Sequence, residues 1–452
     1  MRLRQIHPIF AFLLGFVILS CFLEIYMYSG LVLWMGWPSD KIQAGQKSRP
    51  PTHRMFQASS GQQTSNSRTQ LPNGLQKMNL HPSVAPCEGG TPEPNLVFIK
   101  THKTGSTTLS HIINRFGYTR KLSFALNKRQ TNGHLGYINL STTTPEEIFL
   151  PPIGVSNLSR TFMYNLMTGH ARYDRAKMDA FMTSPTHYVT ILRDPGHQFE
   201  SAFSHFQFDD AFLSKMERKR YKTIPAKLEH FMEKPEFYQD RLKHLSWEKQ
   251  KGLRWYYAKN NQIFDMGLDH EHHEDDDIVS AYIDKLEAEL DLVLITEYYD
   301  ESLLLLKSCL CWDTADILYV SKNMRPPPTP VSESLRKKLR QWNSVDVKLY
   351  KHFNNSLWNK IREYGPNFQT DLAKFREHLK EVFDECVGDL KVSKQGRFKY
   401  SNYKVKAGSG VNCTLIAESK SALFSSIWQR QSQQTDTLVK GGNTQLSLNN
   451  SL

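Results

Sequence analysis

The sequence has little cysteine: its 452 residues contain six. The one close pair, Cys309 and Cys311, lacks the CxxC spacing of a redox pair and is too close to make a zinc site by itself. The run Asp269–Asp277 is rich in His and acidic residues, but its histidines lack the helical i, i+4 spacing of metal ligands. We interpret this run as a solvated charged loop and expect no metal requirement.

Acidic residues are also fewer than basic ones, 45 against 57, which leaves a formal net charge of +12. This excess favours an anionic ligand, a nucleic acid or an acidic surface as partner, and charge alone does not choose among them. The choice must come from motifs.

Long apolar runs are scarce, and the clearest one runs from Ile9 to Leu23. A membrane-spanning helix needs about 20 residues, so we predict a transmembrane anchor over residues 9–28. Arginines in residues 1–8 place that short tail in the cytosol and the rest of the chain in a lumen. A cleaved signal peptide is the alternative, but interfacial aromatic residues, not a small-residue cleavage site, follow the run.

Large apolar residues are rare in residues 29–94, which we predict to be a flexible lumenal stem, and in residues 391–452, which we predict to be a disordered polar tail. The catalytic domain is expected over residues 95–390. In an oxidising lumen some cysteines should pair, and an odd number after the anchor leaves one over. Candidate glycosylation sequons begin at Asn139, Asn157 and Asn354.

Strand-like and helix-like runs alternate within the central region. The apolar strands are predicted at Leu96–Ile99, His187–Leu192 and Leu292–Ile295, each followed by a helix. Gly117 stands where the first of these helices is expected to be capped. Such alternation is typical of an α/β fold with a mainly parallel sheet flanked by helices.

The most informative motif is the turn between the first strand and its helix, residues 100–109. Backbone N–H groups and a helix dipole converge at such a turn, which suits a phosphate or sulfate. A nucleotide triphosphatase or kinase loop needs its lysine after the second glycine, whereas here Lys103 precedes Gly105. The residues expected to hold the anion are Lys100, Lys103, Thr104, Gly105, Ser106, Thr107 and Thr108.

A second motif follows the next strand. Arg193 stands at the strand end, and Ser201 follows eight residues later on the helix. An Arg fork and a Ser hydroxyl at this spacing suit a second phosphate of the same nucleotide. Taken alone, Arg-Asp-Pro is only a good helix start, with Asp194 as N-cap.

Four segments resemble those of the galactose 3-O-sulfotransferase family: FIKTHKTGSTTL, ILRDPGHQFESAF, LITEYYDESLLLLKSCLCW and LYKHFNNSLW. The resemblance covers about residues 90–390. It implies a P-loop-like sulfotransferase fold, 3′-phosphoadenosine-5′-phosphosulfate (PAPS) as donor, and the 3-hydroxyl of a β-galactose in a glycolipid or glycan as acceptor. It also implies a type II protein of the Golgi membrane, with no nucleic acid partner.

The alternatives are sulfation of another sugar position and a non-catalytic glycan-binding protein. The sequence leaves the oligomeric state open, a homodimer included.

Sulfuryl transfer needs a cation at the leaving phosphate, the role expected of Lys103, and a base at the acceptor hydroxyl. We favour His170, whose surroundings are similar to the Gly-His segment of uronyl 2-O-sulfotransferases. His102, beside Lys103, is the second candidate, and a carboxylate such as Glu297 or Glu200 is the third. After the third strand, Glu297 and Tyr298 are expected to bind the sugar.

Overall fold

Four strands form a sheet in the order β2-β1-β3-β4, and every pairing in it is parallel. The strands are β1 Leu96–Ile99, β2 Leu166–Met167, β3 His187–Leu192 and β4 Leu292–Ile295. The bounds of the three predicted strands and the mainly parallel α/β class are confirmed. The registers Ile99↔Thr190 and Leu192↔Ile295 align the carboxyl ends, so the segments after all four strands meet at one edge.

The computed structural model describes Cys87 and residues 89–128, 138, 140, 144–156, 159, 161–244, 255–322, 330–395 and 398–448. Within those ranges no helix combines the length and apolar character needed to cross a bilayer. The predicted anchor, residues 9–28, and the sequons at Asn139 and Asn157 lie outside them.

Helices flank the sheet on the described part of the chain. They are α2 Ser106–Thr119, α3 Pro145–Ile148, α4 Arg175–Asp179, α5 Pro195–His205, α6 Phe208–Phe212, α7 Lys215–Arg220, α8 Ile224–Phe231, α9 Pro235–Lys243, α11 Asn261–Asp265, α12 Asp276–Glu289, α13 Tyr299–Cys309, α14 Thr314–Ile317, α15 Glu333–Trp342, α16 Ser344–Tyr364, α17 Phe368–Cys386, α18 Val411–Ala417 and α19 Lys420–Leu448, with short 3-10 turns η1 Trp255–Ala258, η2 His270–His272 and η3 Thr296–Tyr298.

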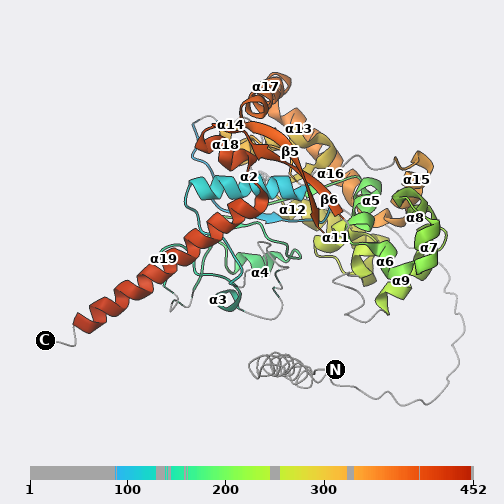
Figure 1. Cartoon of the computed structure of the whole chain (residues 1–452), viewed down its shortest axis with the longest axis horizontal. Helices are drawn as coiled ribbons and strands as arrows, with labels where there is room; N and C mark the ends of the chain where they lie inside the picture. Colours follow the sequence, from blue (N-terminus) through green and yellow to red (C-terminus); the bar gives the residue numbers. More distant parts are fainter. Residues whose placement is uncertain are drawn as a thin grey trace, which may run out of the picture. The chain divides into compact units, whose positions relative to one another are not determined.

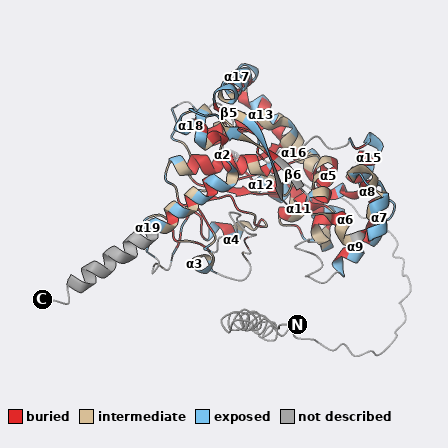
Figure 2. Cartoon of the chain, viewed as in Figure 1, coloured by how far each residue is buried: buried red, intermediate tan, exposed pale blue. Residues whose placement is uncertain are grey.

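Helix α2 is central to the core, and its residues from Thr108 to Gly117 are all buried (Figure 2). The helix continues past Gly117 to Thr119, so the predicted cap at Gly117 is wrong. A Cβ at Gly117 would lie 2.2 Å from the Leu166 side chain and 2.6 Å from that of Phe124. This glycine therefore serves close packing of α2 against β2, not helix termination.

A second apolar cluster lies around α5. It contains buried side chains of α5, α6, α8, α9, η1 and α15. Phe199, Ala202 and Phe203 of α5 have no exposed surface. Trp312 and Trp342 are also buried and belong to the core. Asp194 caps α5 by accepting a hydrogen bond from the His197 N–H, as its sequence position indicates.

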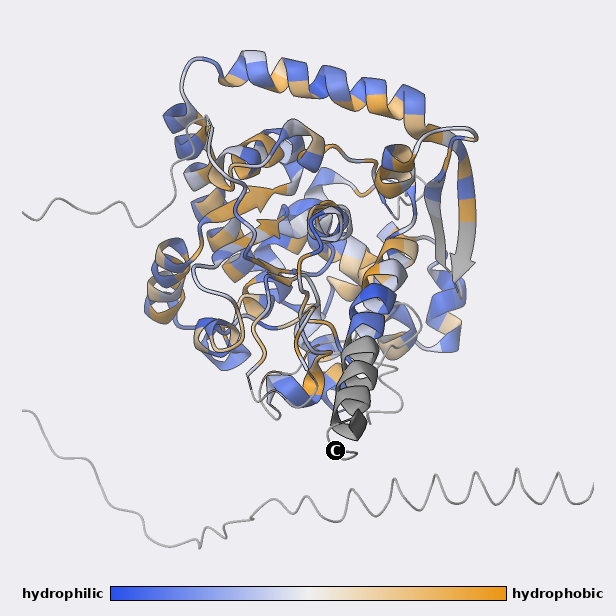
Figure 3. Cartoon of the chain, turned by 90° about the vertical axis from the view of Figure 1, so that its left-hand side faces the viewer, coloured by the Kyte–Doolittle hydropathy of each residue, from blue (hydrophilic) through white to orange (hydrophobic). Residues whose placement is uncertain are grey.

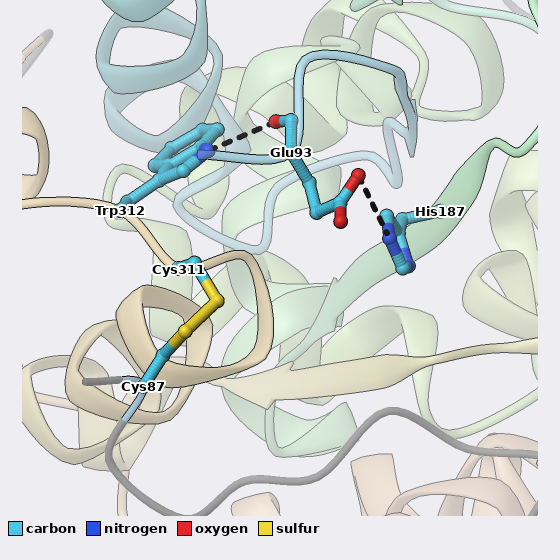
Figure 4. The surroundings of a disulfide bond; sticks show 5 residues. All are labelled: Cys87, Glu93, His187, Cys311 and Trp312. Atoms are coloured by element: carbon cyan, nitrogen blue, oxygen red, sulfur yellow. Dashed lines mark hydrogen bonds and ion pairs between the residues drawn. A yellow bond between two sulfur atoms is a disulfide. The ribbon is translucent and has the colours of Figure 1, made fainter. Parts of the chain in front are cut away.

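Two disulfides connect segments that are 224 and 27 residues apart in the sequence. Cys87 pairs with Cys311 and Cys386 with Cys413, while Cys309 is free and buried. Near the first disulfide the Trp312 indole donates to the Glu93 carbonyl, and the Glu93 carboxylate lies 3.9 Å from His187 (Figure 4). The expectation of some pairing with one cysteine left over is confirmed.

The segment expected to be a disordered tail forms regular structure. A hairpin, β5 Val387–Gln395 with β6 Phe398–Val405, precedes α18 and α19, and α19 packs on α2 (Figure 1). Polar composition hides an apolar stripe on α19, since Leu423, Phe424 and Ile427 are buried. Figure 3 shows hydrophobic and hydrophilic residues together in the coloured part of this helix. The spacing of the stripe fits a helix, and composition alone misses it.

Candidate functional site

The loop between β1 and α2 has the backbone of an anion site. Lys103 and Gly105 adopt positive φ values of 65° and 76°, and Gly105 is the N-cap of α2. No side chain caps α2, and its first turn contains no acidic residue. The first N–H groups of a helix lack intrahelical partners, and the helix dipole is positive there. The exposed backbone at Gly105 can therefore receive a phosphate or sulfate.

The hydroxyls of this loop brace the loop itself. Thr101 and Thr104 hydroxyls lie 2.7 Å apart, and the Ser106 hydroxyl donates to the Thr101 carbonyl at 2.7 Å. Thr108 accepts from the Lys322 backbone N–H. Three predicted ligand hydroxyls thus fix the loop in place, while Thr107 is only half-buried.

The structure brings the two nucleotide motifs together. The Arg193 guanidinium donates to the Lys103 carbonyl at 3.3 Å, and Ser201 lies half-buried on α5. The Gln262 side chain holds the Arg193 backbone on both sides, accepting from its N–H at 2.8 Å and donating to its carbonyl at 2.9 Å. Burial lowers the pKa of Arg193, although nearby carboxylates oppose that shift. A half-buried arginine beside an anion-binding loop is suited to a second phosphate.

Two histidines lie beside the loop. Their rings stack with centroids 4.3 Å apart and planes 13° apart. His170 follows β2, and its Nδ1 lies 3.1 Å from the Lys100 carbonyl, which can only accept. Burial, and next the charge of His102, hold the pKa of His170 well below its usual range. Although both candidates for the base share one site, they are held in different ways.

His102 is held by a carboxylate that the sequence analysis missed, Asp265. The His102 Nδ1 lies 2.8 Å from one Asp265 oxygen and 3.0 Å from the other, and the His102 backbone N–H donates to the same carboxylate at 2.8 Å. Asp265 is 3% exposed. A buried carboxylate at Nδ1 fixes the proton there and leaves Nε2 with its lone pair, the arrangement of a general base.

The short helix α11 supplies Asp265 and organises both halves of the site. Its Gln262 holds the Arg193 backbone, as described above. Its Asn261 side chain accepts a hydrogen bond from the Gln198 amide, and the same amide donates to the His102 carbonyl. The helix start is fixed by Asp346 of α16, which accepts from the N–H groups of Gln262 and Ile263. No motif of the sequence marks α11, because its role depends on partners more than 60 residues away, such as Arg193 at 69 residues.

Aromatic rings line the other side of His102. Tyr257 lies 4.5 Å from the His102 ring, and Phe206 stacks on Tyr257 at 4.8 Å. The half-buried Trp255 and Tyr256 continue this wall. Aromatic faces of this kind suit the apolar face of a sugar ring.

The predicted sugar-binding pair, Glu297 and Tyr298, follows β4 at the carboxyl edge of the sheet, next to the segment that contains Arg193. The Glu297 carboxylate accepts from the Asp194 N–H at 3.0 Å and from the Tyr350 hydroxyl at 3.1 Å. The Tyr298 ring meets Trp358 edge-on at 4.9 Å. Asn354, a candidate glycosylation residue, lies within α16 and is half-buried.

The interpretation of the run Asp269–Asp277 as a solvated charged loop is only partly correct, since its acidic side chains are exposed but its histidines His270 and His273 are packed. η2 lies at its start, and Asp275 caps α12 at its end. The His270 ring stacks on Phe264 at 4.9 Å, and burial lowers the pKa of His270 to about 3 and that of His273 to about 4. These imidazoles therefore belong to the aromatic packing behind the wall.

Comparison with known proteins places these features in a family. The family described as galactose-3-O-sulfotransferase matches residues 5–401. The chain is 32% identical over 305 residues to galactose-3-O-sulfotransferase 2 of Sus scrofa, which covers 66% of this chain and 70% of that protein. It is 32% identical over 303 residues to galactose-3-O-sulfotransferase 3 of Mus musculus, covering 65% and 63%.

Galactosylceramide sulfotransferase of Mus musculus is 30% identical over 300 residues, covering 65% of each chain. The match with the family extends over most of the sequence and includes the loop, both histidines, Arg193 and α11. The chain belongs to the galactose-3-O-sulfotransferase family and is a sulfotransferase.

Proposed function

We propose that this protein transfers a sulfuryl group from PAPS to the 3-hydroxyl of a β-galactose in a glycolipid or glycan. The observation that supports this proposal best is the meeting, at one sheet edge, of an anion-binding loop and a carboxylate-held histidine. Relatives named for galactose 3-O-sulfation and for galactosylceramide sulfation support the acceptor class.

The donor is proposed to lie along the loop and α5. The N–H groups at Gly105 and the start of α2 would hold the 5′-phosphosulfate, and Arg193 with Ser201 would hold the 3′-phosphate. Lys103 would stabilise the negative charge that grows on the leaving phosphate. The uncapped, acid-free first turn of α2 and the contact of Arg193 with the loop fit this assignment.

The base is proposed to be His102, which reverses the order of the two candidates in the sequence analysis. Asp265 holds Nδ1 of His102, so Nε2 can take the proton of the acceptor hydroxyl while the carboxylate stabilises the imidazolium that forms. His170 has only a backbone carbonyl at Nδ1, and its lowered pKa makes it a weaker base. His170 would then position the His102 ring by stacking.

The acceptor galactose is proposed to lie against the aromatic wall of Phe206, Tyr257, Tyr256 and Trp255, because this wall starts at His102. Glu297 and Tyr298 stay a prediction for acceptor binding.

The proposed location is the Golgi membrane, with residues 9–28 as a type II anchor and the catalytic domain in the lumen. The two disulfides support an oxidising compartment. Protease protection of the full-length chain in sealed microsomes tests the orientation: the catalytic domain should be protected, and its digestion without detergent would contradict the proposal.

The activity is tested with the full-length chain in detergent, labelled PAPS and a panel of β-galactosides, including galactosylceramide and a galactose-terminated disaccharide. Lys103→Ala should lower kcat about 100-fold or more, the usual cost of losing one group that stabilises transition-state charge. The control Lys215→Ala removes an exposed lysine of α7 and should change nothing. Full activity of Lys103→Ala would exclude the proposed donor site, and tight binding of the nucleotide without transfer would indicate a glycan-binding protein.

A further inference from the structure

A glycosylation sequon lies in the first turn of α18 and has no part in the proposed reaction. Asn412, Cys413 and Thr414 form the triplet Asn-x-Thr, and the middle residue is not proline. Such a triplet marks an acceptor for an N-linked glycan in a lumenal protein, but it also arises by chance. The surroundings of the triplet in the folded chain therefore decide whether a glycan fits there.

The helix places both ends of the sequon at the surface. Cys413 and Ile416 are 3% and 7% exposed and lie three residues apart, on the face that α18 buries. Successive residues of a helix point about 100° apart, so Asn412 and Thr414 lie on either side of Cys413. Both are exposed. The amide that would carry the glycan and the hydroxyl that the sequon requires are therefore accessible.

The chain that leads into α18 borders open space. Residues 406–408 and 410–412 are all exposed. A Cβ added at Gly408 or at Gly410 would meet no atom within 4 Å. Val411, next to the acceptor amide, is 76% exposed although it is apolar. A glycan is bulky and strongly hydrated, so this part of the surface has room for one and would gain a polar cover.

The sequon shares its middle residue with a disulfide. Cys413 pairs with Cys386, the last residue of α17. In the folded chain the Thr414 N–H also donates to the Gly410 carbonyl at 3.2 Å. The backbone of the sequon is thus already bonded within a helix, and a transferase cannot bind its backbone groups there. Glycan addition must therefore precede the folding of α18 and the closure of the disulfide.

The modification forms one covalent bond at Asn412. Its amide nitrogen bonds to the anomeric carbon of N-acetylglucosamine, the first sugar of an oligosaccharide that is linked to a lipid pyrophosphate. The bond from that carbon to the pyrophosphate oxygen breaks, the lipid pyrophosphate leaves, and the amide nitrogen gives up one proton. The product is still a neutral amide, so α18 gains bulk and hydroxyl groups without a change of charge.

We propose that Asn412 carries an N-linked glycan, which is added before the Cys386–Cys413 disulfide closes. This proposal rests on the proposed lumenal location, because N-linked glycans are added in the lumen. The site is separate from the candidates at Asn139, Asn157 and Asn354. Since addition and disulfide closure compete for the same triplet, a fraction of the chains should close the disulfide first and stay unmodified.

The test uses the full-length chain expressed in cultured animal cells. Peptide N-glycosidase in heavy-oxygen water converts only glycan-bearing Asn to labelled aspartate, and mass spectrometry of peptides then gives the labelled fraction at position 412. Thr414→Ala removes the sequon and should abolish the label, whereas Thr414→Ser keeps the sequon and should retain it. Cys386→Ser removes the disulfide, leaves the sequon intact and should raise the labelled fraction.

The label is measured on peptides, so a variant that folds poorly still gives a result. Absence of label at position 412 in the native chain overturns the proposal. Complete labelling of the native chain, or an unchanged fraction in Cys386→Ser, overturns the competition with the disulfide. Protease protection in sealed microsomes separates two failures: a protected catalytic domain without label refutes the glycan alone, and a digested domain refutes the lumenal location as well.

Discussion

Replacing Asp265 by Asn should inactivate the base while leaving donor binding in place. The amide keeps an oxygen for the His102 backbone N–H, but its NH2 group can donate to His102 Nδ1, which moves the ring proton to Nε2 and removes the lone pair that accepts the hydroxyl proton. Loss of one charge-assisted hydrogen bond is worth about 1.5–3 kcal/mol, and the wrong tautomer adds to that. We expect kcat to fall at least about 100-fold, or ~2.7 kcal/mol.

The assay is the initial rate with labelled PAPS at saturating galactoside, together with the KM for PAPS. This KM should change less than about threefold, because the hydrogen bonds of the Asp265 side chain among the described residues go to His102 and not to a proposed donor residue. Asp291→Asn is the matched control: Asp291 also faces a histidine, His187 at 3.4 Å, but at the amino end of β3. A kcat of Asp265→Asn within threefold of the native value, with His170→Ala inactive, would refute the assignment and return the base to His170.

Three further substitutions test the scaffold. Gly117→Ala places a methyl group against two packed side chains and should lower the free energy of unfolding by about 1–3 kcal/mol, measured by chemical denaturation. Burial raises the pKa of Asp346 to about 7, so the unfolded chain loses this proton near pH 4 and the folded chain only near pH 7. The native free energy of unfolding should therefore fall by up to about 4 kcal/mol between those pH values through this group, and Asp346→Asn should remove that part of the pH dependence. Cys413→Ser opens a loop across a separation of 27 residues and should cost about 3.5 kcal/mol, seen as a lower Tm and faster proteolysis of the C-terminal segment.

The sequence predicted the parts of the fold that depend on local pattern. The strands at Leu96–Ile99, His187–Leu192 and Leu292–Ile295 are apolar or β-branched runs apart from His187, and their bounds agree with the structure. The loop at Lys103 and the cap at Asp194 depend on neighbours a few residues away, so the sequence also predicted them. β2 was missed because it has only two residues, Leu166 and Met167.

The features that escaped prediction depend on partners distant in the sequence. Asp265 reaches His102 across 163 residues, and nothing in its local sequence marks it as a partner of the histidine. Gly117 looks like a helix cap until β2 is seen to pack against it. The C-terminal segment is polar in composition, yet the Gln431 amide is buried and bonds to both backbone groups of Phe124. Composition reports how much apolar surface a segment has, not where it is placed.

The most direct test of the account is the position of the sulfate in the product. The full-length chain is incubated with labelled PAPS and a neutral β-galactoside, and the purified product is assigned by proton NMR, in which sulfation shifts the ring proton on the substituted carbon downfield. We predict label on O3 of the galactose, and its loss in Asp265→Asn. Label on another hydroxyl, or no label while the nucleotide still binds, would contradict it.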